Sequence, residues 1–273
     1  MAKIDRLGWA DGISVVSFGV RVGIRVNDPA VLSRAIERLP PGWKPARASA
    51  IEHLYSLISG DVKPDSKVRR LSLGYWDILR IARSRDFDAV LDAFEAHVQL
   101  TVAEHAPERV FVHAGVVARN GKAIVIPGLS HSGKSTLVSE LIRAGATYYS
   151  DEYAVLDERG RVHAYPRPLG LRRPGSFKTK KVSAEKFGAE TGSKPLRVGL
   201  VVSTNYKAGA RFRPRELTRG KGVLELLANT VSARAQPELA LTALPKALES
   251  ARILKGARGE ASEVVESILK SVD

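Results

Sequence analysis

The sequence contains no cysteine, one methionine and few aromatic residues, which make up 6% of its 273 positions. Without cysteine the chain can form neither a disulfide nor a thiolate metal site. It also has no run of 18 apolar residues, so we expect no transmembrane helix and no membrane partner. The first residues lead into no apolar segment of the kind that marks a secretion signal. These absences predict a cytoplasmic protein.

Acidic residues are scarce relative to basic ones, since 29 Asp and Glu stand against 43 Lys and Arg and give a net charge of +14. Nearly all of this excess falls within residues 161–222, which hold 16 basic residues and three acids. Such a concentration of positive charge attracts an acidic partner, an anionic substrate or nucleic acid. It is equally the composition of a solvated surface. Because the segment has no recognised nucleic-acid-reading motif, we do not expect nucleic acid as a partner.

The hydrophobic content of 44% is sufficient for a packed core, and the chain divides into two regions. Residues 1–105 contain no chemical motif, and we interpret them as an α+β region of unknown role. Alternating apolar residues predict strands, while capping signals and a helical repeat predict helices. The expected elements are a strand over 18–26, a helix over 29–38, a helix through 53–57, a strand near 71–82 and a helix over 88–104.

Residues 106–273 alternate strands and helices, which predicts an α/β domain. Two apolar runs, Val110–Ala118 and Lys122–Ile126, are separated by Asn120-Gly121, a strong signal for a β-hairpin. The further elements expected here are a helix over 136–144 that Gly145 ends, a strand over 148–157, a mobile loop over 175–195, a strand over 198–203, a helix over 217–228, and a tail of helices with one short strand over 239–272.

The most informative motif is the octapeptide 128–135, Gly-Leu-Ser-His-Ser-Gly-Lys-Ser, which fits the pattern G-x-x-x-x-G-K-[ST] of a phosphate-binding loop. It follows a buried strand and precedes a helix, so backbone N–H groups and a helix N-terminus would face a polyphosphate. We expect ATP phosphates to rest on this loop, with Lys134 reaching the β- and γ-phosphates and Ser135 ligating Mg²⁺. The alternative is a glycine- and serine-rich turn with a solvated lysine. The candidate nucleotide-binding residues are Gly128, Ser130, His131, Ser132, Gly133, Lys134, Ser135 and Thr136.

Two adjacent acids, Asp151 and Glu152, follow the loop helix at the expected end of the next core strand. Phosphoryl transfer requires a carboxylate that holds Mg²⁺ and, for a hydroxyl acceptor, a base that takes its proton. An acid pair at a strand end can place one carboxylate toward the metal and one toward the acceptor. The alternative is a surface turn. His113 lies on the strand paired with the one that enters the loop, so we expect it near the γ-phosphate, although a structural role is equally common for a strand histidine.

Several other charged residues have less specific patterns. Arg167 and Arg172 lie in a proline-rich stretch and would clamp the phosphates of the nucleotide or the substrate, unless the stretch is only a rigid surface connection. The remaining histidines have no partner in the sequence, and we expect structural roles for His53, His97, His105 and His163.

The order of these motifs resembles the catalytic domain of bacterial HPr kinase/phosphorylase over about residues 110–175. The shared order is His113-Ala114-Gly115, a hairpin, the glycine loop, a helix ending at 143–145, and Ser150-Asp151-Glu152. That family has a P-loop domain related to phosphoenolpyruvate carboxykinase. The resemblance implies that Lys134 binds phosphate, Ser135 binds Mg²⁺, His113 lies beside the transferred phosphate and Asp151 is the base for the acceptor hydroxyl. We expect Glu152, the second acid of the pair, to assist the metal.

The departures from the family pattern argue against HPr as the substrate. His131 replaces a glycine, Thr136 replaces an acid, Glu152 replaces an aspartate, and a later glutamate is missing. The chain is more similar to HPr kinase-related proteins, which include kinases that tailor lasso peptides.

The sequence therefore predicts an ATP- and Mg²⁺-dependent kinase that phosphorylates a serine or other hydroxyl of a peptide, protein or small molecule. The alternative is a nucleotide-gated binding protein whose basic segment 161–222 holds an acidic partner. The acceptor, a homo-oligomeric state and the choice between ATP and GTP stay open.

Overall fold

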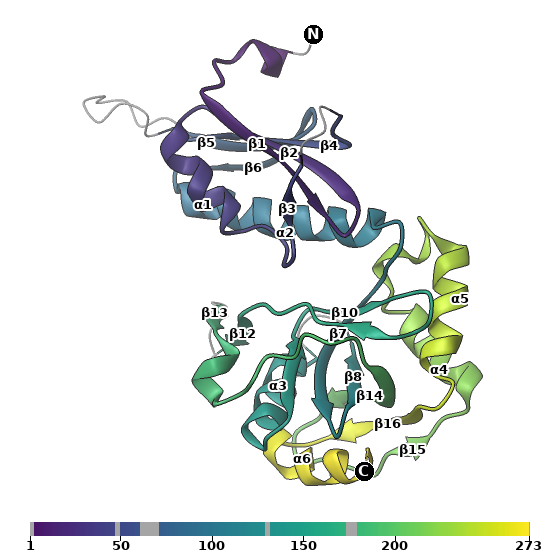
Figure 1. Ribbon diagram of the computed structural model, residues 1–273. Helices are drawn as coiled ribbons and strands as arrows, with labels where there is room; N and C mark the ends of the chain where they lie inside the picture. Colours follow the sequence, from purple (N-terminus) through teal and green to yellow (C-terminus); the bar gives the residue numbers. More distant parts are fainter. Residues whose placement is uncertain (1–2, 47–49, 61–70, 129–131, 173–178, 273) are drawn as a thin grey trace. The chain divides into compact units, whose positions relative to one another are not determined.

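The computed structural model describes residues 3–46, 50–60, 71–128, 132–172 and 179–272 (Figure 1). The chain is of the mixed α/β class and divides into two compact units, Met1–Pro107 and Glu108–Asp273. The division thus falls after Pro107 rather than after residue 105. No helix in the described ranges is long and apolar enough to cross a membrane.

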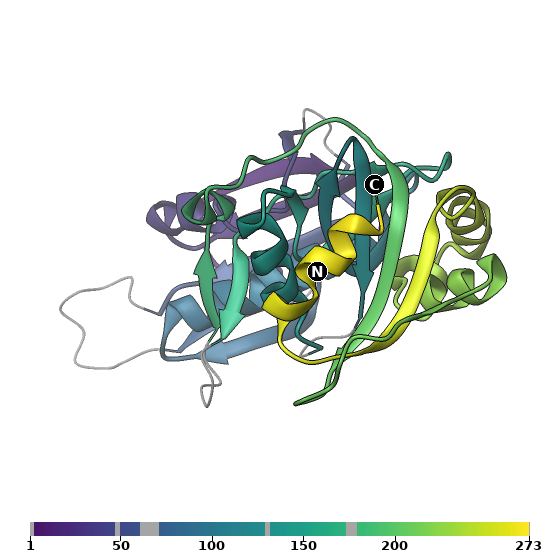
Figure 2. The same ribbon diagram turned by 90° about the horizontal axis from the view of Figure 1, so that it is seen from below.

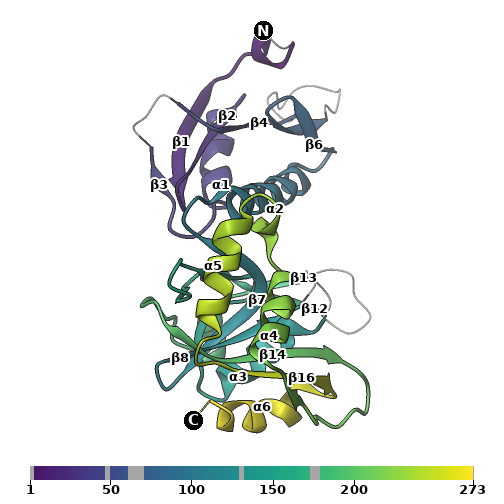
Figure 3. The same ribbon diagram turned by 90° about the vertical axis from the view of Figure 1, so that its right-hand side faces the viewer.

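The first unit is built on a six-stranded sheet in the order β3-β1-β2-β4-β5-β6. All neighbouring strands are antiparallel except β2 and β4, which are parallel. Helices α1 and α2 lie along one face of the sheet (Figure 3). The elements are η1 (Lys3–Arg6), β1 (Asp11–Ser17), β2 (Val20–Val26), η2 (Pro29–Val31), α1 (Leu32–Ile36), β3 (Lys44–Pro45), β4 (His53–Ile58), β5 (Ser72–Trp76), β6 (Leu79–Ser84) and α2 (Phe87–His105).

Two predictions for this unit were wrong. Residues 53–57 form the central strand β4 and not a helix, because a run of six residues is too short to show a period and its pairing with β2 and β5 decides its conformation. Residues 71–82 form two strands and not one, since the chain reverses at Asp77, which has a positive φ of 49°. The predicted strand over 18–26 begins only at Val20, because Phe18 lies in the turn after β1 with φ of 48°.

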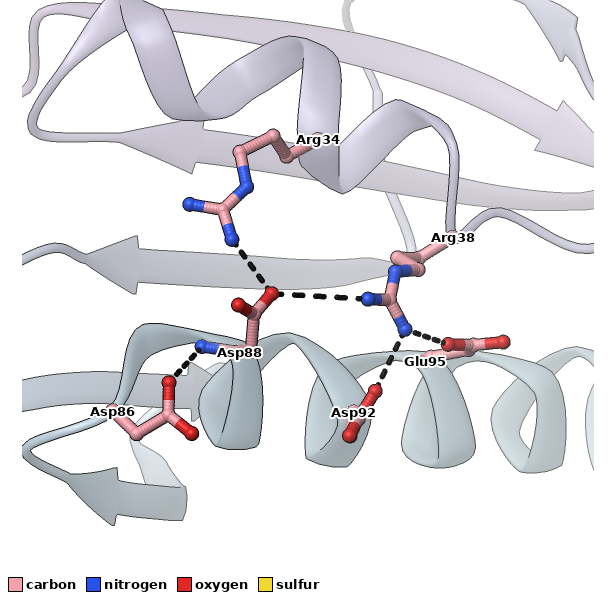
Figure 4. Close-up of polar contacts among 6 residues, drawn as sticks. All are labelled: Arg34, Arg38, Asp86, Asp88, Asp92 and Glu95. Atoms are coloured by element: carbon pink, nitrogen blue, oxygen red, sulfur yellow. Dashed lines mark hydrogen bonds and ion pairs between the residues drawn. The ribbon is translucent and has the colours of Figure 1, made fainter. Parts of the chain in front are cut away.

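Ion pairs join the short helix α1 and the turn that follows it to α2 (Figure 4). A five-residue helix is not stable alone, so its anchoring has to come from tertiary contacts. Asp86 caps the N-terminus of α2 by accepting a hydrogen bond from the backbone N–H of Asp88. The ion pairs, by their N–O distances, are Arg34–Asp88 at 2.6 Å, Arg38–Asp88 at 3.9 Å, Arg38–Asp92 at 2.7 Å and Arg38–Glu95 at 2.6 Å.

Replacing Arg38 by methionine is expected to lower the free energy of unfolding by about 2–4 kcal/mol, because Glu95 is buried and loses a cation that pairs with it. The matched control is Arg34→Ala, since both partners of the Arg34–Asp88 pair are exposed and such a pair is worth at most about 1 kcal/mol. Urea unfolding of the full chain measures both variants. Equal losses for the two would contradict the role given to burial.

The histidines that the sequence left without partners have them in the structure. The Tyr55 hydroxyl lies 2.8 Å from Nδ1 of His97, and the His53 ring lies 4.7 Å from the His105 ring. His163 contacts Oδ2 of Asp157 through Nε2 at 3.0 Å. Burial lowers the pKa of both His53 and His97. These contacts agree with the structural roles expected.

The second unit is built on an eight-stranded mixed sheet. Seven strands follow the order β11-β10-β7-β8-β14-β16-β15, and the eighth, β9, pairs with β7 next to β10. Strands β8, β14 and β16 are parallel to one another, and β7 is antiparallel to β8. The strands are β7 (Val110–Arg119), β8 (Lys122–Pro127), β9 (Thr147–Ser150), β10 (Tyr153–Leu156), β11 (Val162–His163), β14 (Arg197–Tyr206), β15 (Arg215–Glu216) and β16 (Arg252–Arg258), with β12 (Leu169–Arg172) and β13 (Thr179–Val182) forming a separate hairpin.

Helices cover both faces of this sheet, as Figure 2 shows. The helices are α3 (Lys134–Arg143), η3 (Ala184–Phe187), α4 (Arg219–Leu227), η4 (Val231–Ala233), α5 (Pro237–Ala247) and α6 (Ala261–Lys270). Along β8, Ile124 and Ile126 pack into the core under α3 and α6, while Ala123 and Val125 pack into the core under α4 and α5. This explains the unbroken apolar run, because a strand buried on both faces needs no polar alternation.

The hairpin at Asn120-Gly121 is confirmed, and both residues have the positive φ that a two-residue hairpin turn of this type requires, at 50° and 72°. The single strand predicted over 148–157 is wrong, because β9 and β10 are separated by Asp151 and Glu152. The loop predicted over 175–195 contains β13 and η3 in its described part. Residues 173–178 lie outside the described residues.

Candidate functional site

The glycine loop joins the end of β8 to the start of α3. Leu129, Ser130 and His131 lie outside the described residues. Gly133 caps α3 with φ of 83°, a conformation that favours glycine, and an added Cβ there would lie 2.5 Å from Nη2 of Arg258. The α3 N-terminus thus opens at the carboxyl end of β8 with its first backbone N–H groups unbonded within the helix, which is the geometry that binds anions.

Lys134 is buried within the loop and turned back on it. The residue is only 8% exposed, and its Nζ donates a hydrogen bond of 2.6 Å to the carbonyl of Gly128. Burial lowers the pKa of Lys134, while the charges of Glu152 and Asp151 act in the opposite direction. A charged ammonium in this buried position is poorly solvated, so an anion that enters the loop would stabilise it.

The two acids lie in the break between β9 and β10, both of which pair with β7. Since β7 is antiparallel to β8 as well, β9 runs in the same direction as β8. The carboxyl ends of β8 and β9 therefore meet at one edge of the sheet, which brings Asp151 and Glu152 to the glycine loop as the sequence predicted.

Asp151 faces the loop serine. It is 7% exposed, and its Oδ2 accepts a hydrogen bond of 3.1 Å from the backbone N–H of Gly170 on β12. Burial raises the pKa of Asp151 to about 6, against the stabilising effects of the nearby Ser135 hydroxyl and the Gly170 N–H. Its Oδ1 is buried and accepts no well-formed hydrogen bond from the described residues. A buried carboxylate oxygen beside a hydroxyl is a suitable ligand pair for a hard cation.

Glu152 points to His113 instead. Its Oε1 lies 3.4 Å from Nε2 of His113, and although burial acts to raise the pKa of Glu152, the hydrogen bond and charge of His113 lower it. The charges of Lys134 and Arg167 lower it further. The backbone of His113 also supports the loop, because its carbonyl accepts a hydrogen bond of 3.2 Å from the N–H of Gly128.

The two candidate clamp arginines differ. Arg167 lies close enough for its charge to act on Glu152, and its carbonyl accepts a hydrogen bond from the Tyr148 hydroxyl. Arg172 ends β12, and its side chain lies outside the described part of the chain. Ser132 is half-buried at the loop, whereas Thr136 is exposed on the first turn of α3. The structure thus groups Arg167, His113, Lys134, Ser135 and both acids.

Sequence reasoning missed two residues at the loop. Arg258 ends β16 and is 2% exposed, yet its Nη2 donates a hydrogen bond of 2.8 Å to the carbonyl of Gly133. Burial lowers the pKa of Arg258. Gly170 contacts Asp151 as described above. Neither has a signal in the sequence, because each contact joins distant positions and, for Gly170, uses only the backbone.

Comparison with known proteins adds no identification, since no family model matches the chain and no curated protein matches it.

Proposed function

We propose that the chain is an ATP- and Mg²⁺-dependent kinase that transfers the γ-phosphate to a hydroxyl group, most simply a serine of a peptide or protein. The observation that carries the proposal is that the two adjacent acids have different partners: Asp151 faces Ser135 of the glycine loop, and Glu152 is paired with His113. Transfer to a hydroxyl uses one carboxylate at the metal and one group as the base, and the two acids would serve these two roles. The order of strand, loop and helix supports the HPr kinase-like P-loop domain that the sequence resemblance implies.

The residues present fit Mg²⁺. The Ser135 hydroxyl and the unbonded Oδ1 of Asp151 are oxygen donors, and Mg²⁺ typically takes one or two protein oxygens and completes its shell with water and phosphate. Held by Ser135 and Asp151, Mg²⁺ would offset the negative charge that develops on the phosphates during transfer. Because Asp151 contacts Ser135, we assign it to the metal and Glu152 to the acceptor proton, which exchanges the two roles expected from the sequence.

The remaining groups bind the phosphates and move the proton. Backbone N–H groups of the loop and of the first turn of α3 would hold the phosphates, and Lys134 would exchange the Gly128 carbonyl for phosphate oxygens. The acceptor oxygen attacks the γ-phosphorus, the bond to the β-phosphate oxygen breaks and ADP leaves. Glu152, oriented by His113, takes the acceptor proton.

The test is incubation of the full chain with MgATP and a library of serine and threonine peptides, read by mass for one added phosphate. We expect a phosphopeptide together with ADP. A chain that binds MgATP but yields neither product nor ADP with any acceptor would instead support the nucleotide-gated binding protein.

Glu152→Gln is expected to bind MgATP as tightly as the wild type and to transfer phosphate about 10²–10⁴-fold more slowly, because only the base is lost. Glu158→Gln, on an exposed turn, is the matched control. Calorimetry gives the affinity and single-turnover assays give the rate. A different outcome would make Asp151 the base. In that case Glu152→Gln transfers phosphate at the wild-type rate, whereas Asp151→Asn binds MgATP with wild-type affinity but transfers no phosphate.

A further inference from the structure

The ends of three parallel strands define a second side of the glycine loop. Strands β8, β14 and β16 run in the same direction, so Pro127, Tyr206 and Arg258 end at one edge of the sheet. Tyr206 and Arg258 are paired neighbours, and the backbone N–H of Lys207 donates a hydrogen bond of 2.8 Å to the carbonyl of Arg258. Figure 2 shows β14 and β16 side by side. In the sheet order β14 lies on one side of β8, and β7 lies on the other. The acids lie beyond β7, in the break between its partner strands β9 and β10.

Tyr206 presents a fixed aromatic ring at this place. Its Cβ lies 3.8 Å from the position that a Cβ on Gly133 would take, so the side chain starts directly beside the loop. The Tyr206 hydroxyl donates a hydrogen bond of 2.9 Å to Oε1 of Glu260, and the Arg258 guanidinium lies 6.0 Å from the ring centroid. The ring is nevertheless exposed, with 48% of the residue open to solvent.

The position of the acids leaves one direction for the nucleoside. Asp151 and Glu152 lie on the β7 side of the loop, where the acceptor must approach the γ-phosphate. The nucleoside end of a triphosphate lying on the loop therefore extends away from them, toward β14. A flat, fixed and exposed aromatic ring is the surface on which a nucleobase stacks, and such stacking does not depend on the base.

We propose that Tyr206 is the nucleobase-stacking residue of this site, with Glu260 holding the ring in place through the tyrosine hydroxyl. This proposal rests on the proposed function only in requiring a nucleoside triphosphate on the glycine loop. Tyr206 would contact the nucleobase, which a loop that binds the phosphates does not recognise.

The test compares a ligand that has a base with one that has none. Calorimetric titrations of the full chain use MgATP and magnesium tripolyphosphate. We expect Tyr206→Ala to weaken MgATP binding about tenfold and to leave tripolyphosphate binding unchanged. Tyr206→Phe should retain most of the MgATP affinity, because phenylalanine can still stack although it loses the hydrogen bond to Glu260. Tyr206→Leu, which keeps apolar volume without a ring, should behave as the alanine variant does.

Leu241→Ala on α5 is the matched control, since Leu241 is similarly exposed at 57%, and both affinities should stay at the wild-type level. Equal weakening of both ligands by Tyr206→Ala, or of neither, overturns the stacking role. Failure of the proposed function gives a different result: Lys134→Ala then leaves the binding of both ligands unchanged, or neither ligand binds at all.

Discussion

Replacing Lys134 by alanine is expected to reduce phosphoryl transfer by at least about 10²–10³-fold, the usual loss when one preorganised donor to a developing charge is removed. The loop brings this ammonium to the phosphates in a buried position, where a charge interaction is stronger than in water. The ammonium donates a hydrogen bond to the Gly128 carbonyl, and a phosphate would replace this contact. Labelled γ-phosphate incorporation into an acceptor measures the loss.

The fold should tolerate the Lys134→Ala change. Burial lowers the pKa of Lys134, so the charged form is disfavoured in the folded chain and its removal takes away a desolvation cost. The matched control is Lys270→Ala, since Lys270 is exposed on α6 and pairs with Glu266 along its own helix. Transfer by Lys134→Ala at the wild-type rate would exclude the glycine loop as the phosphate site.

The features that the sequence predicted correctly are those that local chemistry decides. Asn120-Gly121 specified its hairpin because few residue pairs accept two positive φ angles in succession. Gly145 ended α3 for a similar reason, and its φ of 89° accompanies the hydrogen bond from the N–H of Ala146 to the carbonyl of Leu141. The order of the motifs along the chain was enough to place Asp151 and Glu152 at the loop.

The features that the sequence did not predict depend on distant partners. The sequence predicts a helix at strand β4, because pairing with β2 and β5, and not the residues of the segment themselves, decides its conformation. The hydrogen bond from Arg258 to Gly133 joins residues 125 positions apart. The orientation of adjacent acids toward different partners depends on the break between β9 and β10, for which residues 148–157 carry no signal.

Asp151→Asn is expected to stabilise the fold while it abolishes Mg²⁺-dependent transfer. The pKa of Asp151 rises from 3.8 to about 6 in the folded chain, so the fold favours the protonated form. This contribution to stability is fully present below pH 3.8 and is lost as the pH rises through 6. At pH 8 the folded chain therefore carries a buried carboxylate at a cost of about 2–3 kcal/mol. Asparagine has the same shape, keeps an acceptor for the Gly170 N–H and carries no charge.

Asp157→Asn is a matched control that should change stability in the opposite direction. Burial acts to raise the pKa of Asp157, but hydrogen bonds from His163 and Arg161 lower it to about 2. Its contribution is present above pH 3.8 and is lost as the pH falls through 2, so the variant should lose about 2 kcal/mol at pH 8. Urea unfolding at pH 8 and at pH 4.5, without nucleotide, measures both variants, and the gain of Asp151→Asn should shrink at the lower pH.

The combination of results identifies what the Asp151 carboxylate does. If an acid supports the fold, neutralising it lowers the free energy of unfolding, as expected for Asp157. If an acid is held in place for a cation, neutralising it raises the free energy of unfolding and abolishes the cation-dependent reaction. Titration of the two variants with Mg²⁺ in the presence of ATP completes the comparison. Loss of stability in Asp151→Asn at pH 8, with Mg²⁺ dependence unchanged, would show that Asp151 is a structural acid and would leave Ser135 without a carboxylate partner for the metal.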